Sequence, residues 1–145
     1  MKIFILEDNS LRNKFFQKNL KEFDVTICNN YDDAIETINK EKFDIFFLDH
    51  DLDESIEKSG NRYKTGYDFA KYMEENKTPY KFIYIHTMNP SGARYMQSCF
   101  DEDLTKIIPF TILFTNIEYH KKDIKRFKLE EVFSYEGITL EKEAL

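Results

Sequence analysis

Five short runs of apolar residues, separated by longer amphipathic or polar stretches, give this chain its pattern. The runs cover residues 3–6, 24–28, 45–48, 82–85 and 107–114. The first, third and fourth are apolar throughout, as strands buried on both faces of a sheet are, and residues 24–28 are a weaker candidate. Pro109 has no amide hydrogen for a sheet, so the fifth strand is expected to start irregularly.

Helices are predicted between these runs, where apolar residues recur at helical spacing. They cover roughly residues 11–22, 32–41, 66–75 and 93–100, and a charged helix with a short tail follows from residue 116. Asn9 or Ser10 can cap the first helix. A polar stretch over residues 53–65, with Ser59-Gly60-Asn61 inside it, and a loop over residues 89–92 complete the pattern. Strands alternating with helices imply right-handed βαβ units and a parallel sheet.

Polar side chains that could take part in catalysis or bind a metal follow three of the apolar runs. They are Glu7-Asp8, Asp49-His50-Asp51 and His86-Thr87-Met88-Asn89. Ligands of parallel sheets bind at the carboxyl ends of the strands, where these groups are expected to meet. Clustered carboxylates repel one another unless a proton or cation lies among them, and hard oxygen ligands favour Mg²⁺. The alternative is that acids such as Asp8 only cap helices or solvate loops.

Composition narrows the class of protein. The chain is 41% hydrophobic and 16% aromatic, which argues against disorder, and no internal repeat or linker divides it, so a single domain over residues 1–145 is expected. The net charge of −6, with Lys and Arg spread throughout, does not favour a long nucleic acid as partner. Cys28 and Cys99 lack metal-type spacing, and no signal or membrane segment is found, so a cytoplasmic protein with reduced, buried thiols is expected.

The strand-end residues resemble those of response-regulator receiver domains. In that superfamily an acidic pair, here Glu7-Asp8, binds Mg²⁺, and an aspartate at the position of Asp49 accepts a phosphoryl group; Thr65-Gly66-Tyr67 adds to the likeness. More specifically, residues 48–52 (LDHDL) and 86–92 (HTMNPSG), with Arg94, resemble a divergent branch, the cyclic-phosphate processing receiver-like domain, which is predicted to act on cyclic phosphates.

The resemblance covers residues 1–104 and implies a three-layer, flavodoxin-like fold with a five-stranded parallel sheet and helices on both faces. It leaves residues 105–145 as an irregular fifth strand and a charged C-terminal helix. Receivers carry a lysine-proline pair at the end of the fifth strand. Here Lys106 comes before the apolar run instead of ending it, which puts the phosphorylation switch in doubt.

Two histidines are the candidate acid and base. His50 and His86, with pKa values expected near neutrality, suit general acid–base work, although His50 could instead only orient Asp49 or Asp51. Asp49 is a nucleophile, a metal ligand or the orienter of a histidine. Asp51 shares the metal or pairs with a basic group. His120 is expected on a solvated helix face.

The candidate phosphate-binding residues lie mostly around the predicted fourth helix. They are Thr87, Asn89, Ser91, Gly92, Arg94 and Arg12. Ser91-Gly92 leads into a helix N-terminus with free N–H groups, and Arg94 offers a planar fork to a phosphate. The amide of Asn89 either donates to a phosphate oxygen or closes a turn.

Three hypotheses follow. The first is a phosphoesterase that hydrolyses a cyclic phosphate of a nucleotide or nucleotide derivative, with Mg²⁺ as a candidate cofactor and a small-molecule ligand as the expected partner. The second is a signalling receiver phosphorylated at Asp49. The third is a non-catalytic module that binds a cyclic nucleotide. Tyr67 and Tyr84 are candidates for stacking on a base.

Overall fold

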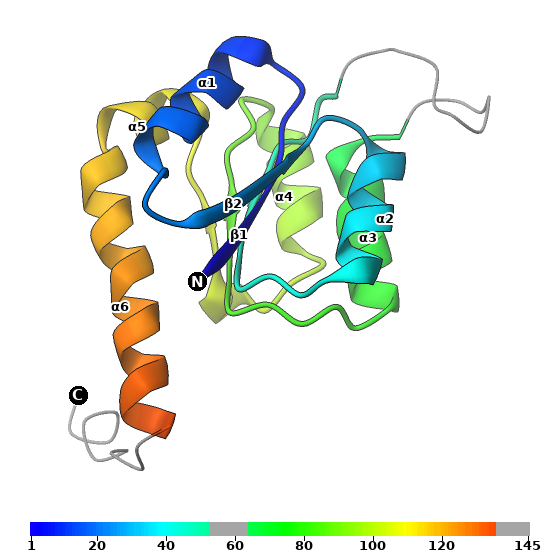
Figure 1. The fold of residues 1–145 in the computed structure, drawn as a ribbon. Helices are drawn as coiled ribbons and strands as arrows, with labels where there is room; N and C mark the ends of the chain where they lie inside the picture. The colour runs from blue at the N-terminus through cyan, green and yellow to red at the C-terminus, as the bar shows by residue number, and fades with distance from the viewer. Residues whose placement is uncertain (53–63, 136–145) are drawn as a thin grey trace.

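The computed structural model describes residues 1–52 and 64–135, with side chains described as far as residue 127. Five parallel strands alternate with helices (Figure 1). The strands are β1 (Lys2–Leu6), β2 (Asp24–Cys28), β3 (Ile45–Leu48), β4 (Phe82–Ile85) and β5 (Thr105–Ile107). Their order across the sheet is β2-β1-β3-β4-β5. The predicted five-stranded parallel sheet is confirmed.

Helices cover both faces of the sheet, as expected for a three-layer fold. They are α1 (Ser10–Asn19), α2 (Tyr31–Lys40), α3 (Gly66–Glu75), α4 (Pro90–Gln97), α5 (Phe110–Thr115) and α6 (Ile117–Tyr135), with a 3₁₀ turn at Glu102–Leu104. Helices α2, α3 and α4 lie on one face, and α1, α5 and α6 lie on the other (Figure 1). No helix within the described ranges is long and apolar enough to cross a bilayer.

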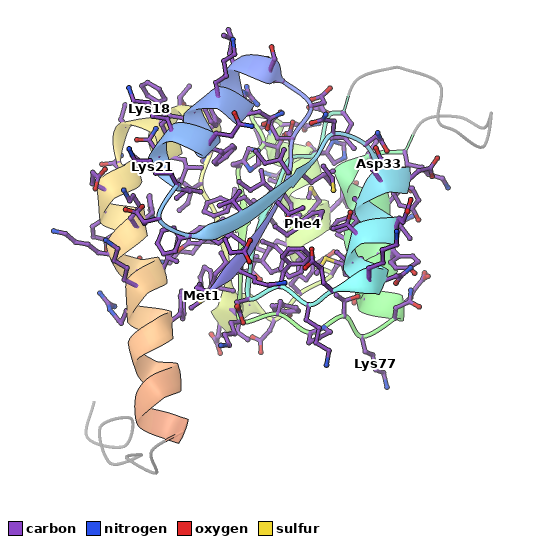
Figure 2. The ribbon with its side chains drawn as sticks, in the orientation of Figure 1. Met1, Phe4, Lys18, Lys21, Asp33 and Lys77 are labelled. Atoms are coloured by element: carbon purple, nitrogen blue, oxygen red, sulfur yellow. The ribbon has the colours of Figure 1, made fainter. Side chains whose placement is uncertain are left out.

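Alternate strand residues feed two separate cores. Phe4 and Leu6 of β1 pack toward α2 and α3, and Ile3 and Ile5 pack toward α1 and α6. Figure 2 shows Phe4 inside the first of these cores, whereas charged side chains such as Lys77 point outward. Because both faces of each central strand are covered, these strands are continuously apolar in sequence.

Four polar side chains begin the helices that follow the strands. Asn9 accepts hydrogen bonds from the first turn of α1, as predicted, and Asn30 and Asn89 do the same for α2 and α4. Thr65 and Asp68 form a reciprocal capping box at α3. These caps satisfy N–H groups that would otherwise be left unpaired, so they fix where each helix starts.

Two predicted boundaries are wrong. The apolar run 107–114 is not one strand, because β5 ends at Ile107 and α5 begins at Phe110. Pro109 cannot donate to the sheet, but its fixed φ suits the start of a helix, and a short apolar run does not by itself distinguish strand from helix. Likewise α4 starts at Pro90, so residues 90–92 are its first turn and not a loop.

Three further expectations concern His120, the two cysteines and the polar stretch 53–65. His120 is only 7% exposed, and its ring packs against Tyr84, so the expected solvated face is wrong at this position. Cys28 is buried, Cys99 is half-buried and both are free thiols. Most of the polar stretch 53–65, with its Ser59-Gly60-Asn61 motif, and the short tail lie outside the described residues.

Candidate active site at the carboxyl end of the sheet

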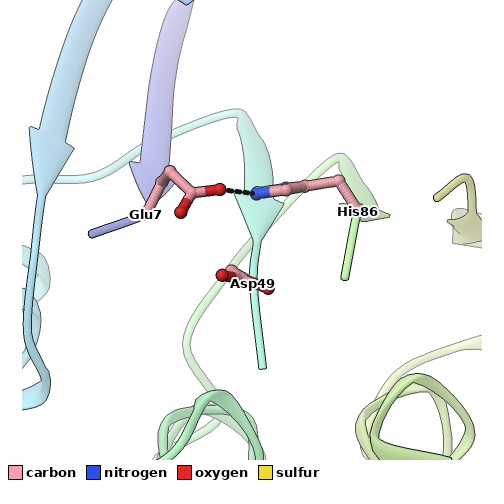
Figure 3. Close-up of side chains that lie close together, drawn as sticks. All are labelled: Glu7, Asp49 and His86. Atoms are coloured by element: carbon pink, nitrogen blue, oxygen red, sulfur yellow. Dashed lines mark hydrogen bonds and ion pairs between the residues drawn. The ribbon is translucent and has the colours of Figure 1, made fainter. Parts of the chain in front are cut away.

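Three buried side chains meet where the central strands end. Glu7 follows β1, Asp49 follows β3 and His86 follows β4. The register pairs Leu6 with Leu48 and Leu48 with Ile85, so the next residue of each strand lies at the same edge. One ligand atom from each of the three lies within 4.8 Å of the others (Figure 3). We call Glu7, Asp49 and His86 the rim cluster.

Glu7 is held by several donors. Its Oε1 accepts a hydrogen bond from Nε2 of His86 at 2.9 Å, and its Oε2 accepts one from the Asn9 amide at 3.0 Å. Arg12 Nη1 lies 3.6 Å from Oε1. Burial raises the pKa of Glu7, but the hydrogen bond and charge of His86, together with Asn9 and Arg12, outweigh it and lower the pKa overall. Glu7 is therefore a carboxylate at neutral pH.

The pKa of Asp49 is shifted in the opposite direction. Asp49 is 3% exposed, and its burial, together with the charge of Glu7, raises its pKa to about 6, although the charges of His86 and Arg12 act in the other direction. Its Oδ1 accepts the backbone N–H of His50 at 2.8 Å. Glu7 and Asp49 thus lie close together in a buried site, and their repulsion contributes to the raised pKa of Asp49. A divalent cation held by the two carboxyl groups would offset this repulsion.

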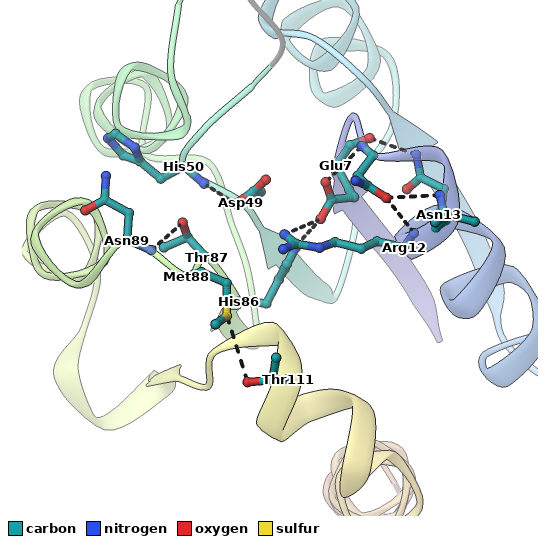
Figure 4. A network of polar contacts seen from close by, with 12 residues as sticks. Glu7, Arg12, Asn13, Asp49, His50, His86, Thr87, Met88, Asn89 and Thr111 are labelled. Carbon is teal, nitrogen blue, oxygen red and sulfur yellow. Dashed lines mark hydrogen bonds and ion pairs between the residues drawn. The ribbon is translucent and has the colours of Figure 1, made fainter.

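Arg12 brings positive charge to the rim cluster from α1. Its guanidinium lies 4.8 Å from the centre of the Phe110 ring, a cation–π contact that directs it over Glu7 (Figure 4). Thr87 follows His86, is buried, and its hydroxyl accepts the Asn89 N–H at 3.2 Å. Both residues were predicted to bind phosphate, and both lie beside the rim cluster.

A second polar group lies toward α4. His50 Nδ1 is 2.8 Å from Asp51 Oδ1, and the Asn89 amide donates to the same oxygen at 3.4 Å. The His50 ring turns toward Asn89 and away from Glu7 and His86 (Figure 4). The Asp51 side chain is 62% exposed and lies outside the rim cluster. Asp51 was expected either to share the metal or to pair with a basic group, and the structure shows it paired with His50.

The N-terminus of α4 is less open than expected. Pro90 has no N–H, the Gly92 N–H donates to Asn89 Oδ1 at 3.0 Å, and the Ala93 N–H donates to the Asn89 carbonyl at 2.9 Å. The amide oxygen of Asn89 is therefore used as a cap, and the predicted free N–H of Gly92 is wrong. Ser91 and Arg94 are exposed on this helix.

Two glycines let the backbone approach the site. A Cβ on Gly66 would lie 1.9 Å from the Asp49 carbonyl oxygen, and one on Gly92 would lie 2.5 Å from the His50 ring. Gly66 also donates its N–H to the His50 carbonyl at 2.8 Å. Both glycines therefore permit contacts that fix the Asp49-His50 segment.

The remaining predicted residue, Asp8, is half-buried beside Glu7 and does not belong to the rim cluster. Sequence reasoning missed Phe110 and Phe16, whose rings flank Arg12 and His86. The signal for Phe110 was its place directly after Pro109. Phe16 lies four residues after Arg12, on the same side of α1.

Within the described part of the chain, no cation stands at the end of β5, where the resemblance to receivers would place a lysine. Ile108, a buried residue, precedes Pro109. Lys106 lies within β5, not before the strand as predicted, and its Nζ is 3.6 Å from Asp123 of α6. Lys106 is thus engaged on the α6 side of the sheet, and Arg12 is the cation paired with the rim cluster among the described residues.

The sheet order and the acids after β1 and β3 define a response-regulator receiver fold. Solved structures agree. A CheY-like receiver domain from Methanospirillum hungatei JF-1 superposes with a TM-score of 0.68 at 12% identity, over 90% of this chain and 97% of the other. Response regulator TrrA from Thermotoga maritima, solved in complex with Mg²⁺-BeF, gives 0.62 at 14% identity, over 83% and 96%.

A third solved structure extends the likeness. A response regulator from Burkholderia pseudomallei, solved with a phosphorylated aspartic acid, a calcium ion and citrate, gives a TM-score of 0.56 at 12% identity, over 94% of this chain and 86% of the other. No curated protein sequence matches this chain. The model of the cyclic-phosphate processing receiver domain matches residues 1–102, and the chain belongs to that family.

Proposed function

We propose that this protein is a phosphoesterase that hydrolyses a cyclic phosphate of a nucleotide or nucleotide derivative at the rim cluster. The observation that carries the proposal is the buried, negatively charged set of Glu7 and Asp49 beside Arg12, with Ile108 where a receiver switch has its lysine. The name of the family supports the choice of a cyclic phosphate.

The carboxylates of Glu7 and Asp49 are the groups that would hold a divalent cation. When bound there, such an ion would polarise a phosphoryl oxygen and lower the pKa of a water ligand. Mg²⁺ and Mn²⁺ suit oxygen ligands of this kind. TrrA, which shares the fold, was solved in complex with Mg²⁺-BeF, and this supports Mg²⁺ as the cofactor proposed here.

Hydrolysis of a cyclic phosphodiester breaks one P–O ester bond, adds the oxygen of water to phosphorus and returns a proton to the leaving oxygen. Arg12, which lies beside Glu7, and the Thr87 hydroxyl would stabilise the charge on the non-bridging oxygens. His50 is our candidate proton donor, because the contact with Asp51 fixes the ring through Nδ1 and leaves Nε2 for the leaving group. Ser91, Gly92 and Arg94 would line the approach from α4.

The test is turnover of a panel of substrates: 2′,3′-cyclic and 3′,5′-cyclic nucleotides and ADP-ribose cyclic phosphate, each with and without Mg²⁺ or Mn²⁺. We expect hydrolysis of at least one, reduced 100-fold or more in Asp49→Asn because a charge-bearing group at the reacting centre is removed. Asp103→Asn, an exposed acid after β4 and α4, is the matched control. Equal turnover by both variants would refute the assignment of the site.

A second candidate is a phosphoaccepting receiver. The position of Asp49 at the end of β3 and the phosphorylated aspartic acid of the Burkholderia pseudomallei neighbour favour it. It predicts a stable adduct at Asp49 after incubation with acetyl phosphate, detected as an added phosphoryl mass. Tight binding of a cyclic nucleotide without turnover would favour the third candidate, a binding module.

A further inference from the structure

The two ring nitrogens of His86 have very different surroundings. The side chain is fully buried, and Nε2 lies 2.9 Å from Glu7 Oε1. Nδ1 is also buried and has no hydrogen-bond partner among the described residues. The ring packs edge-on against Phe16, with centroids 5.3 Å apart, and Phe110 lies at 6.3 Å. Aromatic rings therefore pack against an imidazole whose Nδ1 has no polar contact among the described residues.

This asymmetry fixes the position of the proton. An ionised carboxylate only accepts hydrogen bonds, so the short contact with Glu7 requires the hydrogen on Nε2. In the neutral ring, which is the only form that can bind a metal, Nδ1 is then a bare lone pair. The opposite tautomer would put an N–H group at the buried Nδ1, for which the described residues offer no acceptor, and a buried donor without a partner is costly.

A metal ion can bind an imidazole nitrogen only through a lone pair. Ligation by Nε2 would therefore move the hydrogen to Nδ1 and create that unpaired donor. Histidines that bind metals normally donate their other N–H to a carboxylate, a carbonyl or water. Among the described residues His86 has no such acceptor, although one of its ring nitrogens lies within 4.8 Å of a carboxylate oxygen of Glu7 and of Asp49.

We infer that His86 is a positioning residue, which holds Glu7 through Nε2–H and leaves a divalent cation to the carboxylate oxygens of Glu7 and Asp49. The inference rests on the metal site of the proposed function and sharpens it. A site with oxygen ligands alone selects Mg²⁺ or Mn²⁺, whereas an imidazole ligand would favour Zn²⁺.

Two spectra of the ¹⁵N-labelled protein test this without any substrate. Long-range ¹H–¹⁵N correlation of the metal-free protein reports which nitrogen of His86 carries the hydrogen, and we expect Nε2. Electron spin-echo modulation of the Mn²⁺-loaded protein reports nitrogen bound to the metal, and we expect none. Hydrogen on Nδ1, or a strong coupling to a directly bound nitrogen that disappears in His86→Gln, would overturn the inference.

Binding of Mn²⁺ to variants gives an independent readout. In His86→Gln an amide N–H can replace Nε2–H, so the affinity should stay close to that of the wild type. His86→Leu removes the donor and should weaken binding about 10- to 100-fold. Equal losses in both variants would mean that His86 is a ligand. His120→Gln, the same change at another buried histidine with an unpaired Nδ1, is the control.

Failure of this inference and failure of the proposed activity are distinguishable. A protein that turns over no cyclic phosphate can still show Nε2–H and a metal bound by oxygen alone, which would support the role of His86. If Mn²⁺ does not bind at all, the tautomer spectrum decides: hydrogen on Nε2 supports the contact with Glu7, and hydrogen on Nδ1 refutes it.

Discussion

Glu7 and Asp49 lie at one edge of the sheet, yet their carboxyl groups have opposite tendencies. Donors from His86, Asn9 and Arg12 keep Glu7 ionised, whereas Asp49 is buried and, among the described residues, accepts one hydrogen bond, from the backbone N–H of His50. Two such groups side by side combine a fixed negative charge with one that readily takes a proton or shares a cation. This difference comes from a few N–H groups and not from the type of residue.

We predict that Asp49→Asn stabilises the metal-free protein at neutral pH. Burial raises the pKa of Asp49 to about 6, so the folded state favours the protonated carboxyl. The stability that it contributes is therefore present at low pH and is lost as the pH rises through 6. The variant should gain up to about 3 kcal/mol in free energy of unfolding at pH 8, and little at pH 4.

Urea denaturation in EDTA at both pH values measures this effect. Asp51→Asn is the matched control, because the Asp51 side chain is mostly exposed and its removal should not produce the same rise with pH. A variant of Asp49 that is no more stable than the wild type at pH 8 would contradict the prediction.

At the scale of elements, the two glycines beside the site differ in what they touch. A Cβ on Gly66 meets the backbone of Asp49 and His50, directly after β3, which cannot easily move aside, whereas one on Gly92 meets the His50 side chain. Gly66→Ala should therefore destabilise the protein more than Gly92→Ala, which should cost about 1–3 kcal/mol. Denaturation midpoints check the order. Ser91→Ala, exposed on the same turn as Gly92, is the control, and an equal cost at all three positions would refute the argument.

Helix α6 packs closely enough on the sheet to bury a histidine. Burial lowers the pKa of His120, with Lys106 acting in the same direction and Asp123 against it. The folded state thus favours the neutral ring, and the contribution of His120 to stability falls as the pH drops below about 6.5. We expect His120→Gln to lose less stability than the wild type between pH 7 and pH 5, measured by urea denaturation. Parallel losses would show that His120 is accessible.

The sequence predicted most elements because their local signals and their tertiary surroundings agree. Residues 45–48 are apolar throughout and are buried throughout. The run 107–114 misled because it is mostly apolar, with Thr111 as its one hydroxyl residue, and such a run occurs both in strands and in helices packed on a sheet. His120 misled because its neighbours Tyr119 and Lys122 are exposed, which hides the single inward position.

For the whole molecule, a bound cation should couple the site to global stability. An ion that binds only the folded state adds about 2.7 kcal/mol to the free energy of unfolding at 100 times its Kd. We expect Mn²⁺ to raise the melting temperature of the wild type by several degrees at pH 7.5, and not that of Asp49→Asn. Scanning fluorimetry with Mn²⁺ or with EDTA measures the shift. An equal shift in the variant would place the ion elsewhere.

The sequence alone determined the parallel sheet, most of its strands and the identity of the strand-end acids and histidines, because hydrophobic periodicity and the position of a residue after a strand are local properties. It also singled out Arg12 and Thr87. Only the tertiary structure decided which of these residues act together. Burial and the N–H groups within reach shift the pKa values of Glu7 and Asp49 in opposite directions. His50 contacts Asp51, and Nδ1 of His86 has no partner among the described residues. Those contacts join residues as far apart as 79 positions, and no local pattern records them.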